Sequence, residues 1–176
     1  AHEQFGVPTL YRSKHFGVLA SLRPREVRLP DPARGEAELP REGLLAELAQ
    51  RLREPGRPWG RQLRGFAPDE ANVNDYRRAE GHLLHLHWDD RGLYGEEVCS
   101  LSLLGDATMT FALGGRSNFR RGPAAEAGAE DERPLVRVRL PARSLLLLKG
   151  PARFEWQHGF PEPADFASER RVAVVF

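Results

Sequence analysis

The segment LLHLHWDD, residues 83–90, is the part of this sequence that decides how the rest of the chain is interpreted. Side chains alternate between the two faces of an extended strand, so His87 and Asp89 share one face and lie about 6.6 Å apart along it. An imidazole and a carboxylate in this arrangement can converge on one point. The segment therefore predicts part of a metal site, which needs at least one further ligand from elsewhere in the chain.

A lone histidine in a strand is more often a packed or solvated residue than a metal ligand. Of the six histidines, His82, His85 and His87 crowd this one region, and only His87 has a carboxylate two residues further on. Far downstream, His158 offers a third ligand. Two histidines and one carboxylate, with coordination positions left open, form the facial arrangement that binds non-haem Fe(II). Asp90 points to the opposite face, so we assign it to a substrate or to a group that orients a ligand.

Length and composition bound the class of protein. A chain of 176 residues suits one structural domain with a single sizeable core. It has no run of about 18 apolar residues, which a membrane-spanning helix needs, so we expect no membrane partner. A net charge of +1 excludes a polycation that holds nucleic acid by bulk charge alone.

The single cysteine, Cys99, rules out an internal disulfide and favours a reducing compartment. We therefore expect an intracellular protein, nuclear or cytoplasmic. The N-terminus lacks the basic and then apolar layout of a signal peptide. Because the printed sequence does not begin with Met, a targeting segment ahead of it would also allow a mitochondrial location.

From residue 71 onward the sequence predicts short strands, each apolar or alternating and bounded by Gly, Pro or Asp. Eight such strands without a helical pattern between them indicate a mainly β protein, a sandwich or jelly roll. The predicted strands span residues 71–76, 83–88, 98–104, 107–113, 135–140, 144–149, 154–158 and 171–176. The range 114–133, rich in Gly, Ala and Glu, is interpreted as an insertion of low specificity.

The first 70 residues look different. The basic and aromatic segment 11–19 is either a strand and hairpin whose basic rim faces a charged partner or an ordinary edge strand. The proline-rich range 23–40 predicts a surface loop. Leucines at helical spacing after Pro40 predict one amphipathic helix that ends near Arg53 or Glu54 and packs on the outside of a sheet. We expect a lid segment and supporting helix over 1–70 and a jelly-roll core over 71–176, within one structural domain.

Six short motifs follow one another in the order and at the spacing found in one enzyme family. They read NDY (74–76), HWD (87–89), SLSL (100–103), LPARSLL (140–146), GPARFEWQH (150–158) and RVAVVF (171–176). Each motif alone has low specificity, but six in order are specific. Over nearly its whole length the chain resembles the AlkB branch of Fe(II)- and 2-oxoglutarate-dependent dioxygenases.

The resemblance implies a double-stranded β-helix (jelly roll) with one or two flanking helices and an N-terminal substrate lid. It also implies cofactors, namely Fe(II), 2-oxoglutarate and O2. The Fe(II) ligands would be His87, Asp89 and His158.

For 2-oxoglutarate, the resemblance implies a salt bridge from Arg171 and hydrogen bonds from Asn74 and Tyr76. Arg170 is a competing candidate, but only Arg171 has the family's spacing to the end of the motif. The family pattern has Asn where this chain has Ala173, and it continues with an arginine after residue 176. We therefore expect the natural sequence to extend further.

By the same resemblance, the reaction is oxidative demethylation of N-methylated bases in DNA or RNA, which releases succinate, CO2 and formaldehyde. The residues assigned to substrate are Arg12, Lys14, His15, Trp88 and Asp90, with Trp59 as a second stacking candidate.

The stretch 88–104 looks most similar to the fourth and seventh human AlkB homologues, a group associated with protein lysine, N6-methyladenine or transfer RNA. A protein demethylase or hydroxylase and a non-catalytic jelly-roll binding module therefore stay as alternatives. Strand preference and oligomeric state do not follow from the sequence.

Overall fold

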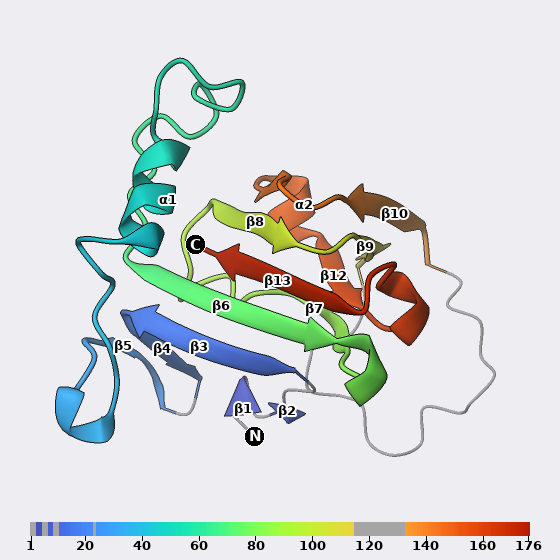
Figure 1. Cartoon of the computed structure of the whole chain (residues 1–176), viewed down its shortest axis with the longest axis horizontal. Helices are drawn as coiled ribbons and strands as arrows, with labels where there is room; N and C mark the ends of the chain where they lie inside the picture. Colours follow the sequence, from blue (N-terminus) through green and yellow to red (C-terminus); the bar gives the residue numbers. More distant parts are fainter. Residues whose placement is uncertain (1–2, 5–6, 9–10, 23, 115–132) are drawn as a thin grey trace.

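The computed structural model of the chain describes residues 3–4, 7–8, 11–22, 24–114 and 133–176. Two antiparallel sheets pack face to face (Figure 1). The four-stranded sheet, in the order β10-β9-β12-β7, consists of β7 (Leu84–His87), β9 (Ala107–Leu113), β10 (Leu135–Leu140) and β12 (Trp156–Phe160). The five-stranded sheet, in the order β11-β8-β13-β6-β3, consists of β3 (Arg12–Gly17), β6 (Glu70–Arg77), β8 (Val98–Leu104), β11 (Leu145–Leu148) and β13 (Arg170–Val175). This is the predicted double-stranded β-helix.

Smaller elements surround the two sheets. The short strands form two pairs, β1 (Glu3–Gln4) with β2 (Val7–Pro8) and β4 (Leu19–Leu22) with β5 (Arg25–Arg28). The helices are α1 (Leu44–Leu52) and α2 (Pro151–Phe154), with 3-10 turns η1 (Pro32–Arg34), η2 (Arg78–Glu80) and η3 (Pro163–Asp165). None of the helices in the described ranges has the length and apolar character needed to cross a membrane.

The first core lies between the two sheets. Its buried members come from both of them and from the segment after β12: Tyr76, Val98, Ala107, Met109, Phe111, Leu140, Leu148, Phe160 and Phe166. At one end three rings pack together, with centroids 5.2 Å apart for the stacked Tyr76 and Phe166 and 5.0 Å apart for the tilted Phe160 and Phe166. Burying a side chain of this size stabilises the fold by about 1.5–3 kcal/mol.

The second core lies on the outer face of the five-stranded sheet, beneath α1 (Figure 1). Its buried members are Ala49, Leu52, Leu63, Ala71, Cys99, Val174 and Phe176. The predicted helix after Pro40 is therefore confirmed, and it begins at Leu44, directly after Gly43, whose φ of 80° favours glycine. Leu44 itself is 62% exposed, so only the later leucines of the predicted stripe pack on the sheet.

Two local predictions were wrong. Phe154 belongs to α2 rather than to the strand, because Gly150 and Pro151 begin a helical turn there. The range 23–40 is not all loop, since β5 pairs with β4 as a hairpin. This ribbon depends on backbone hydrogen bonds, and its Val27 is 52% exposed, so no apolar pattern revealed it.

The N-terminal part joins the core directly. β3 is an edge strand of the five-stranded sheet, hydrogen-bonded to β6, and the β4–β5 hairpin follows it. The boundary at residue 70 stays a prediction. The predicted insertion at 114–133 falls almost wholly outside the described residues.

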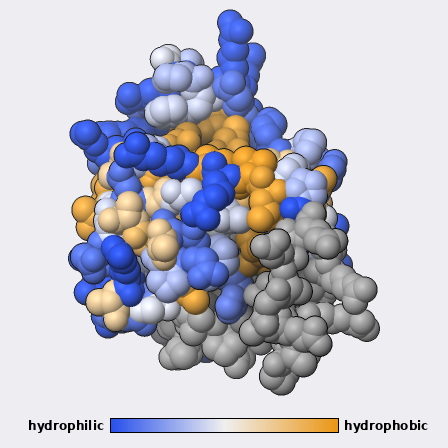
Figure 2. Space-filling model, turned by 90° about the vertical axis from the view of Figure 1, so that its right-hand side faces the viewer, coloured by the Kyte–Doolittle hydropathy of each residue, from blue (hydrophilic) through white to orange (hydrophobic). Residues whose placement is uncertain are grey.

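Apolar side chains also reach the surface. Figure 2 shows the face at the right of Figure 1, with an apolar patch among hydrophilic residues. Within the described ranges, the large apolar side chains with high exposure are Val27, Leu29, Leu44, Leu104, Leu135 and Val136. The last two lie on β10, which forms an edge of the four-stranded sheet.

Candidate metal centre

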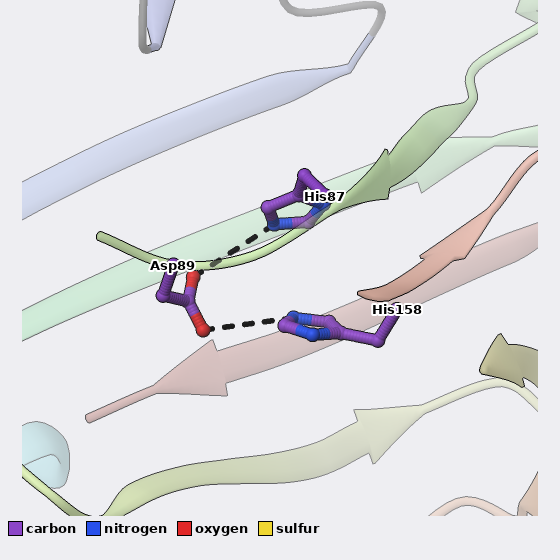
Figure 3. Close-up of side chains that lie close together, drawn as sticks. All are labelled: His87, Asp89 and His158. Carbon is purple, nitrogen blue, oxygen red and sulfur yellow. Dashed lines mark ion pairs between the residues drawn. The ribbon is translucent and has the colours of Figure 1, made fainter. Parts of the chain in front are cut away.

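The three side chains predicted as metal ligands converge in the structure (Figure 3). One donor atom from each of His87, Asp89 and His158 lies within 4.8 Å of the other two. Oδ1 of Asp89 is 3.8 Å from Nε2 of His87, and its Oδ2 is 3.6 Å from Nε2 of His158. The centroids of the two imidazole rings are 4.6 Å apart. The fold thus brings two imidazoles and one carboxylate to one point from distant parts of the chain.

Strand pairing places the two histidines. β7 and β12 are neighbours, and His87 lies directly opposite His158. A register shift follows in β12, where Gly159 allows a close approach of the strands. A Cβ at Gly159 would lie only 2.4 Å from the carbonyl oxygen of Leu84. The glycine after the ligand is therefore required by the geometry of the site.

Asp89 is placed differently from the expectation. β7 ends at His87, so Asp89 lies beyond the strand, in the connection that follows it. Strand alternation therefore predicted correctly that the side chain of Asp89 points toward His87. It did not predict that Asp89 lies in a loop after the strand.

The surroundings prepare these groups as ligands. Nδ1 of His87 lies 2.8 Å from the carbonyl oxygen of His85, which only accepts, so Nδ1 is the donor there and Nε2 is the nitrogen that faces Asp89. Burial lowers the pKa of His158 to about 4 despite the nearby charge of Asp89, so this ring is neutral at pH 7. Burial by itself raises the pKa of Asp89, but His158, His87 and Arg153 outweigh it and hold that pKa below its ordinary value.

The cluster also holds polar atoms that need a partner. Within the described part of the chain, Oδ2 of Asp89 and Nδ1 of His158 are buried without a hydrogen bond. Leaving such an atom unsatisfied costs about 1–3 kcal/mol. A coordinated metal ion would satisfy the carboxylate oxygen, and two imidazoles with one carboxylate suit Fe(II). The residues present therefore fit the metal.

Arg171 occupies the inner face of β13 and is 1% exposed. Its guanidinium donates to Oγ of Ser102 at 2.9 Å and to the carbonyl oxygen of Gly105 at 3.3 Å, and it lies 5.4 Å from the ring centroid of Phe160. Its Nε is buried with no hydrogen-bond partner among the residues described. A buried cation is costly unless it is paired, so this environment fits an anionic ligand such as a carboxylate. Arg170, the competing candidate, lies on the opposite face of β13 and donates to Asp75 instead.

Asn74 and Tyr76 lie on the inner face of β6, opposite Ala173 and Arg171 of β13. Asn74 is 7% exposed, and its Oδ1 is buried without a hydrogen-bond partner in the described ranges. Burial raises the pKa of Tyr76 well above its ordinary value, and its ring centroid lies 4.6 Å from that of Tyr11. The three residues that the resemblance assigns to 2-oxoglutarate thus share one inner surface.

The predicted substrate residues of β3 divide between two faces. His15 pairs with Asn72 and faces inward, and its Nδ1 lies 3.0 Å from Oδ1 of Asn72. Arg12 and Lys14 alternate with it and face outward, and Arg12 donates to Glu80 at 2.9 Å. Among these three, only His15 therefore shares the inner face of the sheet with the residues assigned to 2-oxoglutarate.

The two tryptophans proposed for stacking differ in the same way. Trp88 is next to Asp89, and the guanidinium of Arg91 lies 4.4 Å from its ring centroid. Trp59 packs against the second core, across the five-stranded sheet from the metal cluster. Trp88 is therefore close enough to the metal cluster to stack on a substrate base, whereas Trp59 lies on the other side of the sheet.

Asp90 has clear structural contacts. Its Oδ1 accepts from Arg25 at 2.6 Å and from the backbone N–H groups of Gly92 and Leu93 at 2.8 and 2.9 Å. These bonds stabilise the turn after the metal ligand and connect it to β5. A role with substrate stays a prediction.

Sequence reasoning missed two charged side chains. Arg153, 2% exposed, donates to the backbone of Asp89 and Asp90, and its place in the GPARFEWQH motif was the available signal. Glu70 begins β6 on the inner face and accepts from Asn72 at 2.6 Å. Burial raises the pKa of Glu70 to about 7. Its phase with Asn72 along the strand was the signal that could have found it.

Comparisons with known proteins agree with this site. The family model of the 2OG-Fe(II) oxygenase superfamily matches residues 31–176. The human protein named alpha-ketoglutarate-dependent dioxygenase alkB homolog 4 is 31% identical over 128 residues, which is 65% of this chain and 42% of that protein. The Caenorhabditis elegans protein named DNA N6-methyl adenine demethylase is 24% identical over 115 residues, 65% of this chain and 33% of that protein.

The solved structure of OsALKBH1 has a similar fold, with a TM-score of 0.61 at 16% identity, and the match covers 94% of this chain and 77% of that one. The chain spans less than half the length of the two curated relatives named above. Because the family model matches most of the chain, the chain belongs to the 2OG-Fe(II) oxygenase superfamily, and within it the chain is similar to the human AlkB homologue named above.

Proposed function

We propose that this protein is an oxidative demethylase that removes N-methyl groups from bases in DNA or RNA. The observation that carries the proposal is a two-histidine, one-carboxylate cluster combined with a buried arginine, Arg171, whose Nε has no hydrogen-bond partner among the described residues. The family brings Fe(II), 2-oxoglutarate and O2 as cofactors. The proposal adds the class of methylated substrate.

Each group has a distinct task in this proposal. His87, Asp89 and His158 would hold Fe(II), which with 2-oxoglutarate and O2 would supply the oxidation that hydroxylates the methyl group. Arg171 binds the distal carboxylate of 2-oxoglutarate with its planar donors. Asn74 and Tyr76 hydrogen-bond the cosubstrate from the same face of the sheet. The N-hydroxymethyl product then releases formaldehyde and restores the N–H group.

Support for a nucleic-acid substrate comes from the relative named DNA N6-methyl adenine demethylase and from the AlkB branch itself. An enzyme of this kind takes its base from a single strand or flips it out of a duplex. The inward-facing His15 and the adjacent Trp88 are the side chains we assign to the base.

A protein substrate is the second candidate. The outward-facing Arg12 is already paired with Glu80, and Lys14 faces outward as well, so these basic groups lie away from the inner face. With a net charge of +1, the chain offers few phosphate contacts. These observations suit a substrate that carries little negative charge.

One experiment separates the candidates. The protein is incubated with Fe(II), ascorbate and 2-oxoglutarate, together with oligonucleotides that carry N6-methyladenine or N1-methyladenine or with methyl-lysine peptides. Mass spectrometry measures methyl loss, and succinate and formaldehyde are quantified. Turnover of oligonucleotides but not peptides supports the proposal, and turnover of peptides alone replaces it with the second candidate. Absence of succinate under all conditions contradicts both and favours a binding module.

A further inference from the structure

Arg153 is one of the most deeply buried side chains of the described residues, with 2% exposure. Arginine is almost never fully buried unless it is paired, because its charge is costly to remove from water. It lies in α2, five positions before the ligand His158. A buried arginine cannot be explained as a solubilising surface charge, so its contacts must account for it.

The contacts of Arg153 supply that reason. Its Nη1 donates to the carbonyl oxygen of Asp89 at 2.9 Å, and its Nη2 donates to the carbonyl oxygen of Asp90 at 2.9 Å. One planar guanidinium thus binds two consecutive peptide groups, which a single ammonium does not match. The two partners lie 64 and 63 residues away in the chain.

Asp90, in the segment that Arg153 binds, has other hydrogen bonds, and its carbonyl oxygen also accepts from the N–H of Tyr94 at 3.3 Å. β7 ends at His87, so the strand pairing that positions both histidines does not extend to Asp89. On the outer side, Asp90 is held through its own carboxylate by Arg25, whose side chain is 59% exposed. Of these two guanidinium contacts, only that of Arg153 is buried and acts on the backbone of Asp89 itself.

We propose that Arg153 is a positioning residue of the iron site. By fixing the Asp89 and Asp90 peptide groups against α2, it holds the carboxylate of Asp89 toward the two imidazoles before the metal binds. The α2 segment leads directly into β12, so one short stretch of chain carries His158 and sets the position of Asp89. The proposal rests on the assignment of the metal ligands and is independent of the methylated substrate.

The test measures metal binding without turnover. Co(II) or Mn(II) is titrated into the wild type and Arg153→Met by isothermal calorimetry, and the visible absorption of the Co(II) form reports ligand geometry. We expect metal affinity to fall by about 10- to 100-fold, the usual effect of removing a group that orients a metal ligand. The Co(II) spectrum should change as well, which a loss of general stability would not cause.

Arg137→Met is the matched control, because Arg137 pairs with the buried Asp165 at 2.7 Å, away from the metal cluster. It should lower stability but leave metal affinity within about threefold. Arg153→Lys keeps one donor for one of the two carbonyl groups, so it should recover part of the affinity. If Arg153→Met does not fold, Arg153→Lys decides the matter, with a reduced affinity and an altered spectrum expected.

Wild-type affinity and an unchanged Co(II) spectrum in either folded variant would overturn the proposal. These assays contain no methylated substrate and no 2-oxoglutarate. A failed demethylation assay with normal metal binding would therefore contradict only the proposed function, and the reverse result only the role of Arg153.

Discussion

The two faces of β6 are both covered, yet they hold opposite kinds of side chain. Asn72, Asn74 and Tyr76 face the interior between the sheets, whereas Ala71 and Val73 pack beneath α1. Burial alone therefore does not mark the functional face. The functional face gathers several buried polar atoms that lack a hydrogen-bond partner among the described residues, from Asn74, Asp89, Arg153, His158 and Arg171, whereas in the second core Nε1 of Trp59 is an atom of this kind.

The difference shows how the molecule separates stability from function. The apolar outer face contributes free energy by removing side chains from water. The inner face keeps polar groups that cost free energy until ligands satisfy them. Substitutions on the two faces should therefore have opposite effects, and the following experiments test this.

The largest effect is expected for Asp89→Ala. Removing the carboxylate leaves two imidazoles, so metal affinity and succinate formation should both be abolished, a loss of at least about 1000-fold. Thermal unfolding of the metal-free protein should stay near that of the wild type, because the carboxylate is held by no strand. Retained turnover in this variant would show that the metal assignment is wrong.

Leu52→Ala tests the outer face. Leu52 of α1 is 2% exposed in the second core, between the helix and the sheet, so its truncation should lower the free energy of unfolding by about 3 kcal/mol. Urea denaturation measures this loss, and Leu44→Ala, at a position 62% exposed, is the matched control with little expected change. Metal affinity should be unchanged in both folded variants. A large change in metal affinity would show that the two faces are coupled.

Arg171→Met tests whether a buried charged group on the inner face lowers the stability of the ligand-free protein. The KM for 2-oxoglutarate should rise by about 100-fold, or about 2.7 kcal/mol, while Co(II) affinity stays constant. The ligand-free variant should unfold at the same or a higher temperature than the wild type, because an unpaired buried cation is replaced by an apolar side chain. A clear loss of stability would instead make Arg171 a structural residue of the core.

Glu70→Gln tests whether the raised pKa of Glu70, on the inner face, makes the stability of the protein depend on pH. Burial raises the pKa of Glu70 to about 7 from 4.5, with Asp69 and Asp89 acting in the same direction and His15 and Asn72 against it. The folded state therefore binds this proton more tightly than the unfolded state. The resulting stability is complete below pH 4.5 and is lost as the pH rises through about 7.

Urea denaturation at pH 5 and pH 8 should thus show a drop in wild-type stability that Glu70→Gln reduces by about 2 kcal/mol. The amide of glutamine keeps an acceptor for Asn72 but does not ionise. An identical pH dependence in both proteins would contradict the assigned pKa. Glu36→Gln, which removes a carboxylate paired with Arg28 of β5, serves as a control for general charge effects.

The smallest effect compares two residues of one strand. His15→Ala, on the inner face of β3, should raise the KM for a methylated substrate by about tenfold, or 1.4 kcal/mol. Arg12→Ala, on the outer face, should change it by less than about twofold. Uncoupled consumption of 2-oxoglutarate should stay unchanged in both. A larger effect of Arg12 would place substrate on the outer face or at the edge of the sheet.

Strand alternation and family motifs made much of the site predictable. His87 and Asp89 stood out because a carboxylate followed a histidine in phase, and His158 and Arg171 stood out by their motif spacing. Of Arg171 and Arg170, the structure turns only Arg171 toward the interior, and its role with 2-oxoglutarate stays a prediction. The lid residues were less predictable, because a basic segment does not reveal which of its alternating side chains faces the interior.

By itself, the sequence determined the mainly β fold, the helix that covers the sheet and the identity of the converging histidines and carboxylate. These features depend on local periodicity and on short motifs, which act over a few residues. Only the tertiary structure decided which face of β3 and β6 looks inward, that Trp59 belongs to the second core, and that Arg153 binds the Asp89 segment. Such contacts join residues far apart in the chain, so no local pattern encodes them. They depend on how two sheets and one helix pack, which is settled only when all three are in place.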